Sequence, residues 1–174
     1  MKRSELTILP KGIEGYVNIV DDIEVIEALN LSLKELQEIP LDKWQALGDK
    51  VYAPGKWTAK QLLQHVIDTE RVFAYRALAF ARKETQTLIS FDEDLYAANA
   101  PTSHRTLDDI YKEAILVRQS TIALFLSFTE EMLHIIGKSS INTYSVGSIG
   151  FVIAGHQRWH FKVLGERYFP LLNA

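Results

Sequence analysis

Apolar side chains recur at three- and four-residue intervals between Ile149 and Leu164, and two histidines stand at the centre of this stripe. The spacing predicts an amphipathic helix with one face turned toward a core. His156 and His160 lie one turn apart on that face, with Cβ atoms about 5–6 Å from each other. Two neutral imidazoles so placed are able to bind one metal ion without bending the helix, which removes the unfavourable burial of unpaired ring nitrogens. The stripe consists of Ile149, Val152, Ile153, His156, His160, Val163 and Leu164.

Three further stretches of the chain have the same helical periodicity, and each follows a residue that commonly caps a helix. The candidate caps are Asp21 or Asp22, Thr58 and Thr106, and Ser145 precedes the stretch that carries the two histidines. No segment alternates in the manner of a strand. We therefore expect an all-α four-helix bundle, with extra short helices in the connections and no sheet. The predicted helices cover residues 21–39, 58–83, 106–128 and 145–168.

Shorter pieces connect the predicted helices. Residues 1–20 contain Pro10, Gly12 and Gly15, and we expect them to form an extended lead-in. The link from Pro40 to Trp57 has room for about one helical turn and is short enough to make the first two helices antiparallel neighbours. A short helix is expected from Glu130 to Ile136.

The longest connection runs from Ser90 to Arg105 and has no sustained period. Its residues 91–96 are expected to form one or two helical turns, and Pro101 interrupts the segment. Long connections in compact domains often act as lids over functional sites. We predict that this one lies over a metal site between the second and fourth helices.

Composition excludes several classes of protein. The 174 residues are 47% hydrophobic and 24% charged, which is typical of a globular protein and consistent with one domain over residues 1–174. A net charge of −3 and the absence of any Lys/Arg run argue against nucleic acid as a partner. The chain has no cysteine, so thiolate metal sites and a cysteine nucleophile are excluded. Met1 to Leu6 lack the apolar segment of a signal peptide, and no uncharged run reaches about 18 residues, so we expect a soluble cytoplasmic protein without a membrane partner.

A third histidine is placed to complete a metal site with the pair. His65 lies at the edge of the apolar arc of the helix predicted at residues 58–83. Three histidines without an acidic or thiolate fourth ligand leave coordination positions open, as in catalytic zinc sites. Packing of the histidines in the core is the alternative, because two histidines four residues apart are a weak motif alone. His104, in a polar loop, and His134, near the end of a short helix, are expected to have surface or structural roles.

Other polar residues follow His65 along the same helix. Asp68 lies one turn on and is a candidate either to accept a hydrogen bond from a ligand's free N–H or to act as a general base. An exposed helix carboxylate is the alternative for this residue. Tyr75 and Arg76 are candidates to line a pocket, although Arg76 is equally suited to pair with a carboxylate at the rim of the bundle.

Two tryptophans flank the candidate ligands in the sequence. Trp57 precedes the expected cap of the second helix, where a hydrophobic staple onto the helix explains it. Trp159 lies between His156 and His160 but off their common axis. We therefore expect it to point away from the histidines and to pack in the core or in an interface.

Several segments together resemble the DinB superfamily (DinB/YfiT-like proteins), and the resemblance covers nearly the whole chain. The lead-in, the second-helix region, the loop that follows it and the final helix all match in order, which is far more specific than the histidine pair alone. The matching segments are residues 16–20, 54–58, 63–71, 73–76, 91–94 and 153–156, then His160, Leu164 and residues 166–168.

The resemblance implies a four-helix bundle, often dimeric, in which three histidines hold a divalent metal. By position these are His65, His156 and His160, the same three that periodicity selects. Asp92, in the segment that matches the family's loop, joins Tyr75 and Arg76 as a candidate pocket residue. Three imidazoles suit several metals; zinc or nickel is expected first, with iron or manganese as alternatives.

The resemblance implies one of two kinds of function, each with a small molecule as the substrate. Some members of the family are transferases that use low-molecular-weight thiols such as bacillithiol or mycothiol, and others resemble metal-dependent hydrolases. A metal-dependent enzyme of either kind, acting as a homodimer, is the leading hypothesis. The alternatives are a stress-response protein that binds a metal or small ligand without turnover, and a structural helical dimer whose histidines only pack.

Overall fold

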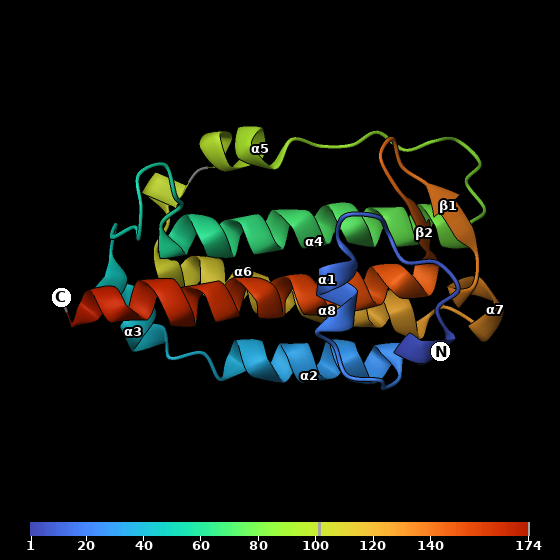
Figure 1. Ribbon diagram of the computed structural model, residues 1–174, viewed down its shortest axis with the longest axis horizontal. Helices are drawn as coiled ribbons and strands as arrows, with labels where there is room; N and C mark the ends of the chain where they lie inside the picture. The colour runs from blue at the N-terminus through green and yellow to red at the C-terminus, as the bar shows by residue number, and fades with distance from the viewer. Residues whose placement is uncertain (101, 174) are drawn as a thin grey trace.

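Four long helices lie side by side in the computed structural model, which describes residues 1–100 and 102–173 (Figure 1). Each packs against two of the others, in the ring order α2, α8, α4, α6. Helices α2 and α8 run in one direction along the bundle, and α4 and α6 run in the other (Figure 1). The four helices are α2 (Val25–Gln37), α4 (Ala59–Ala81), α6 (Leu107–Leu126) and α8 (Val146–Val163). The predicted helical bundle is confirmed.

Side-chain caps fix the starts of three of these helices where the sequence placed them. The Thr58 hydroxyl accepts a hydrogen bond from the backbone N–H of Gln61, whose side chain bonds back to Thr58. Thr106 and Asp109 form the same reciprocal box at the start of α6. Ser145 caps α8. Each cap satisfies backbone N–H groups that have no partner within the helix.

The start of α2 differs from the prediction. The helix begins at Val25, and its first turn receives no side-chain cap from Asp21 or Asp22. The Asp22 carboxylate instead accepts a hydrogen bond from the backbone N–H of Ser4, so this side chain binds the lead-in and does not cap the helix. At the other end of the chain, α8 continues as a π-helical segment, η3 (Leu164–Tyr168), and a 3-10 turn, η4 (Phe169–Leu172).

The order of the helices contradicts the expected antiparallel pairing of the first two. Helices α2 and α4 both pack against α6 and α8 and lie at opposite corners of the ring. The link between them contains α3 (Leu41–Leu47), which packs near the C-terminal turn η4 and against α6. The link was predicted to hold about one helical turn. Its longer helix carries the chain across the end of the bundle, so the short link does not impose a neighbour relation.

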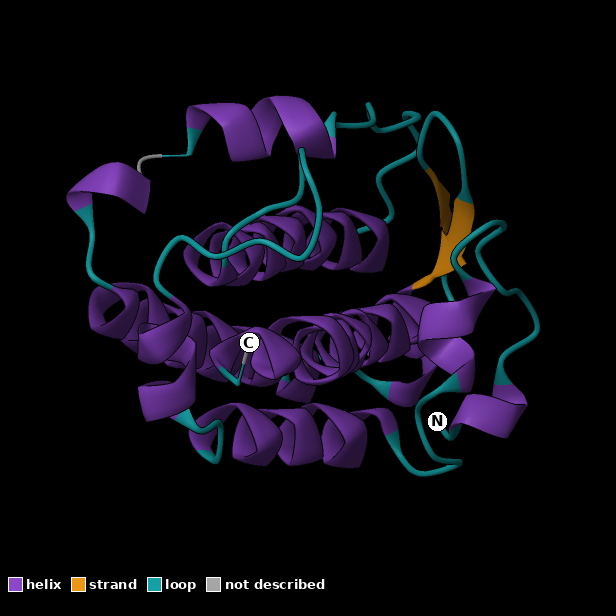
Figure 2. Cartoon of the chain, turned by 60° about the vertical axis from the view of Figure 1, so that its left-hand side comes forward, coloured by secondary structure: helices purple, strands orange, loops and turns teal. Residues whose placement is uncertain are grey.

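A small sheet contradicts the prediction of none. Strands β1 (Ile136–Lys138) and β2 (Thr143–Ser145) pair antiparallel, with Gly137 opposite Tyr144, and the hairpin stands at one end of the bundle (Figure 2). Three-residue strands are too short to show an alternating pattern. The predicted helix from 130 to 136 is accordingly shorter, because Ile136 already belongs to the hairpin.

The remaining connections also contain short helices. The lead-in, expected to be extended, is helical in part, and the predicted turns at 91–96 correspond to α5. Pro101, expected to interrupt this connection, lies outside the described residues. Within the described residues, no helix is long and apolar enough to cross a membrane. The short elements are η1 (Arg3–Glu5), α1 (Glu14–Asn18), α5 (Glu93–Asn99), η2 (Thr102–His104) and α7 (Glu130–Leu133).

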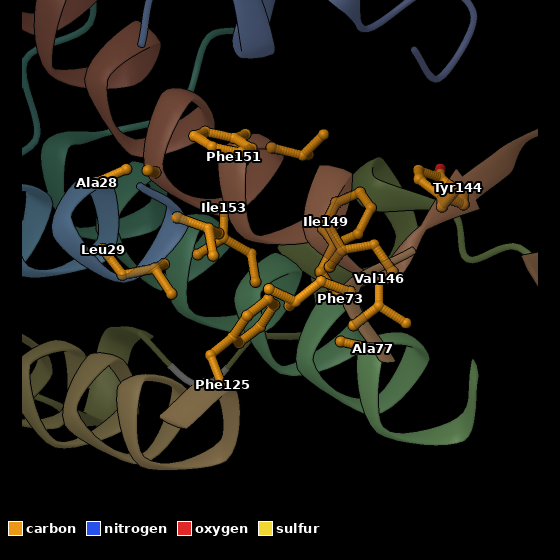
Figure 3. Close-up of a cluster of buried hydrophobic side chains, with 14 of the residues drawn as sticks. Ala28, Leu29, Phe73, Ala77, Phe125, Tyr144, Val146, Ile149, Phe151 and Ile153 are labelled. Atoms are coloured by element: carbon orange, nitrogen blue, oxygen red, sulfur yellow. The ribbon is translucent and has the colours of Figure 1, made fainter. Parts of the chain in front are cut away.

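The apolar core divides into two clusters along the bundle. The first lies toward the hairpin and takes side chains from all four long helices, among them Leu29, Phe73, Phe125 and Ile149 (Figure 3). The second lies toward the chain's C-terminal turn and includes Leu63. Apolar burial of this kind contributes about 25 cal/mol for each Å² removed from water.

Helix α1 lies across α8 at its one glycine-histidine step (Figure 1). A Cβ atom on Gly155 would stand 1.7 Å from the backbone oxygen of Tyr16. Only a residue without a side chain permits this approach. Because Gly155 immediately precedes His156, the same contact brings Tyr16 against the candidate metal ligand.

Replacing Gly155 with Ala should therefore destabilise the protein by about 1–3 kcal/mol, since α1 must move away from α8. Gly165→Ala is the matched control, because no described residue beyond its chain neighbours and its own helix backbone has an atom within 4 Å of the Cβ position there. Urea denaturation of the two variants measures the difference. Equal stability of both would contradict the close approach of α1.

Candidate metal centre

Three histidine side chains from two helices converge inside the bundle. His65 comes from α4, and His156 and His160 come from successive turns of α8. The Nε2 atom of His156 lies 3.1 Å from that of His65 and 3.0 Å from that of His160. One ligand nitrogen from each residue lies within 4.8 Å of the others. His65 and His156 are each 5% exposed and His160 is half-buried, so two of the three rings are almost closed to solvent.

Burial keeps these imidazoles neutral. It lowers the pKa of His65 from 6.5 to about 3, with His160 adding repulsion, and lowers the pKa of His160 to about 4. Burial also lowers the pKa of His156 well below its usual value, and repulsion from His160, His65 and then Arg118 adds to the effect. A neutral imidazole offers the lone pair that metal binding requires.

The donor set fits a divalent cation better than it fits hydrogen bonds among the rings. His156 Nε2 faces two other Nε2 atoms, yet it has either one proton or one lone pair to share with them. Tetrahedral coordination with metal–nitrogen bonds of about 2.0–2.1 Å places ligand nitrogens about 3.3 Å apart. The two spacings at His156, 3.1 and 3.0 Å, are close to that value. His65, His156 and His160 are therefore the residues that could hold a metal ion.

Neighbouring side chains fix the rings of two of the histidines. The Trp57 ring lies 4.5 Å from the His65 ring between centroids, and the edge of Tyr16 meets His156 at 5.2 Å. Thr69 Oγ1 lies 3.5 Å from His65 Nδ1, on the side away from the cluster. Sequence reasoning assigned none of these contacts. The contact of Thr69 could have been predicted, because Thr69 is four residues after His65. The contacts of Trp57 and Tyr16 join segments that are distant in the chain.

Two cavities give access to the cluster. One of about 310 Å³ is bordered by His156, and another of about 360 Å³ is bordered by His160. Glu93, in the first turn of α5, borders both. Burial raises the pKa of the Glu93 carboxyl, and the adjacent Asp94 and Asp92 carboxylates add to the shift. The cluster is thus approached from two sides that meet at one carboxylate.

The family assignment follows from a match over most of the chain. The model of the DinB superfamily matches residues 25–164, which span all four long helices and the three histidines. The chain belongs to the DinB superfamily. No curated protein matches it.

A solved structure shares the fold of this DinB-superfamily chain. It is YfiT from Bacillus subtilis, described as a probable metal-dependent hydrolase with an unusual four-helix bundle topology. The two chains are 14% identical, and the match covers 95% of this chain and 90% of YfiT with a TM-score of 0.68. At this identity the likeness shows the fold alone.

The other predicted site residues of this superfamily member lie at different distances from the cluster. The Asp68 carboxylate accepts a hydrogen bond from Gln64, and burial raises its pKa. It borders a cavity of about 540 Å³ between α4 and α5 that none of the three histidines lines. Tyr75 is 59% exposed and also lines no cavity with a histidine. Asp92 caps α5 by accepting hydrogen bonds from two backbone N–H groups, whereas Arg76 borders the cavity at His156.

Trp159 and the long connection are also placed by the structure. Trp159 is 42% exposed and borders the cavity at His160, so it does not pack in the core, and packing in an interface stays a prediction. Trp159 lies on the solvent-exposed side of α8, next to the face that carries the two histidines, which explains its position at the rim of the cavity. Ser90, Phe91, Glu93 and Asp94 of the long connection border one or both cavities, as predicted for a segment over the histidines, whereas Asp92, predicted to line a pocket, borders neither of them. Opening and closing of this segment stay predictions. His104 is exposed, and His134, 50% exposed in its side chain, follows α7.

The lowered pKa values predict how acid affects the metal-free protein. Between about pH 6.5 and pH 4 the unfolded chain binds protons at these histidines and the folded chain does not, so stability should rise with pH across this window and level off above it. Each imidazole contributes a slope of at most about 1.4 kcal/mol per pH unit. Urea denaturation from pH 4.5 to 7.5 measures the slope. His160→Gln should reduce it, with the exposed His104→Gln as control; an unchanged slope in His160→Gln would contradict burial of that ring.

Proposed function

We propose that this chain is a divalent-metal-dependent enzyme that acts on a small molecule, with His65, His156 and His160 as the metal ligands. The observation that carries the proposal is the convergence of three neutral Nε2 atoms at the walls of two cavities. Ligand sites are typically concave, mostly apolar and formed between packed elements. The shared fold with YfiT, itself described as a probable metal-dependent hydrolase, supports the same assignment.

The chain's own residues would prepare the site for chemistry. When bound, a divalent cation supplies Lewis acidity that lowers the pKa of a water or a thiol. Trp57 and Thr69 hold the His65 ring in place, and Tyr16 packs on His156. Glu93 borders both cavities, and its raised pKa makes it the carboxyl best placed to accept or return a proton during the reaction. Asp68 lies in a different cavity, so we assign it no such part.

Hydrolysis is the first candidate reaction, because YfiT is described in these terms. Transfer of a low-molecular-weight thiol is the second, and the presence of two cavities favours it, since a thiol and its electrophile need separate places. Zinc or nickel is the expected metal, because three imidazoles with open positions suit both. Assembly as a homodimer and a cytoplasmic location stay predictions.

Single replacements of the three histidines test the ligand set. His65→Ala, His156→Ala and His160→Ala should each lower zinc affinity by at least about tenfold, because two imidazoles remain in a site built for three. His104→Ala and His134→Ala should retain the metal. Elemental analysis of untagged protein measures the content, and the parent's melting temperature should rise with zinc by an amount that corresponds to about 2.7 kcal/mol at a hundredfold excess over Kd.

The outcomes separate metal binding from packing. If the histidines only pack, their replacement destabilises the fold while added zinc leaves the parent's melting temperature unchanged. If the His65→Ala protein holds as much metal as the parent, His65 is not a ligand, and the link between α4 and α8 at this site is lost.

A second experiment separates the two reactions from simple binding. The zinc-loaded protein is incubated with a panel of small esters, amides and aromatic electrophiles, with and without a low-molecular-weight thiol. Hydrolysis without thiol that stops on chelation supports a hydrolase, and conjugation that requires the thiol supports a transferase. Metal binding with no turnover of either kind would support the stress-response alternative and contradict an enzyme.

A further inference from the structure

A buried cation borders the cavity next to His156. Arg76, from α4, is 3% exposed, and its guanidinium carbon lies 5.3 Å from the ring centroid of Phe73 and 5.9 Å from those of Phe91 and Tyr144. Its Nη2 donates a hydrogen bond to the backbone oxygen of Ile89 at 3.3 Å. Burial lowers the pKa of this guanidinium and Tyr144 partly offsets the shift, yet an arginine stays charged in a protein.

Arg118, the other arginine that is buried among the described residues, shows how unusual this is. Within residues 1–100 and 102–173, no carboxylate lies within ion-pair distance of Arg76, although Glu93 borders the same cavity. An aromatic ring stabilises a cation through its face but accepts few of the five N–H bonds that a guanidinium offers. By contrast, Arg71 and Arg105 pair with Glu113, Arg118 with Glu70, and Arg158 with Glu35.

A second side chain on the same cavity also lacks a partner. The Oδ1 atom of Asn142, from the turn of the hairpin, is buried and accepts no hydrogen bond. Buried polar atoms are rarely left unpaired in native proteins, and each such case needs an explanation. Asn142 and Arg76 border one cavity with His156, so one bound molecule could satisfy both if it offers an acceptor to Arg76 and a hydrogen-bond donor to Asn142 Oδ1.

We propose that this cavity binds the carboxylate of the substrate at Arg76, with an apolar or aromatic portion among Phe73, Phe91 and Tyr144 and the reacting group toward His156. A carboxylate accepts two parallel hydrogen bonds from a guanidinium, which a neutral amide cannot do. The volume of about 310 Å³ is at the lower end for ligand sites and suits a small acid. Only the placement of the reacting group rests on the proposed function; recognition of the anion does not.

Isothermal titration calorimetry with phenylacetate and phenylacetamide tests the proposal. Metal-free protein is used first, so that the carboxylate has no ion to bind. Phenylacetate should bind the parent at least tenfold more tightly than phenylacetamide. Arg76→Gln should remove this preference, and Arg76→Lys should keep only part of it, because an ammonium group does not form the bidentate pair.

Arg71→Gln is the matched control. Arg71 is on the same helix, its side chain is 52% exposed, and it does not border the cavity at His156. This variant should bind phenylacetate as the parent does. Failure of the parent to prefer phenylacetate over phenylacetamide would overturn the proposal, whether or not the Arg76 variants fold. Equal binding by the parent and a folded Arg76→Gln protein would overturn it as well.

The same measurement with His160→Ala distinguishes a failure of this proposal from a failure of the proposed metal-dependent function. That variant should lose zinc and still bind phenylacetate, because His160 borders the other cavity. Zinc binding without phenylacetate binding in the parent would refute the anion site alone. Phenylacetate binding in a parent that takes up no zinc would refute the metal site and leave the anion site standing.

Discussion

The structure depends on one buried ion pair at the centre of the bundle. Arg118 of α6 is fully buried and donates two hydrogen bonds of 2.9 Å to the Glu70 carboxylate of α4. It also donates to the hydroxyl of Ser32 on α2, whose backbone oxygen accepts from the Gln157 side chain of α8 at 2.7 Å. Each long helix thus supplies one polar group. Leaving one charge of such a pair without its partner costs about 3–5 kcal/mol, so a shift of one helix along the bundle that separates Arg118 from Glu70 is unfavourable. Gln157 directly follows His156, and Glu70 lies little more than one turn beyond His65, so the register that satisfies Arg118 also brings the ligand nitrogens together.

The two arginines buried along α4 and α6 are stabilised in different ways. Arg118 has a carboxylate and a hydroxyl as partners, and its charge is fully used within the fold. Arg76 has aromatic rings and one backbone oxygen, and its charge has no anion among the described residues. A buried charge without a counter-ion is costly unless the site performs a task that needs it. Stability explains Arg118, and binding is the simplest physical reason for Arg76.

Helix positions and the three histidines were predictable because they follow from local geometry. Thr58 and Thr106 cap helices through contacts three residues away, and His156 and His160 face the core because residues four apart share a helix face. The ring order of the helices was not predictable from link length, since α3 carries the chain across the bundle end. Thr69 rather than Asp68 lies near His65 because the position four residues on, not three, falls on the buried side of α4. The Asp68 carboxylate is more reactive than the Thr69 hydroxyl, but only the residue on the buried side of the helix lies near the His65 ring.

Part of the walls of the site comes from segments outside the four-helix bundle, and sequence reasoning missed most of these wall residues. Gly155 admits the backbone of α1, and Tyr16 of that helix covers His156. The hairpin supplies Asn142 and Tyr144, the segment before α5 supplies Phe91, and the first turn of α5 supplies Glu93. None of these contacts is local in the chain, so no periodicity reveals them. The bundle supplies the ligand nitrogens and the Arg76 charge at fixed positions, while three connections shape the space in front of them. Changes in those connections would therefore alter which molecule fits without disturbing the Arg118 ion pair that holds the histidines in register.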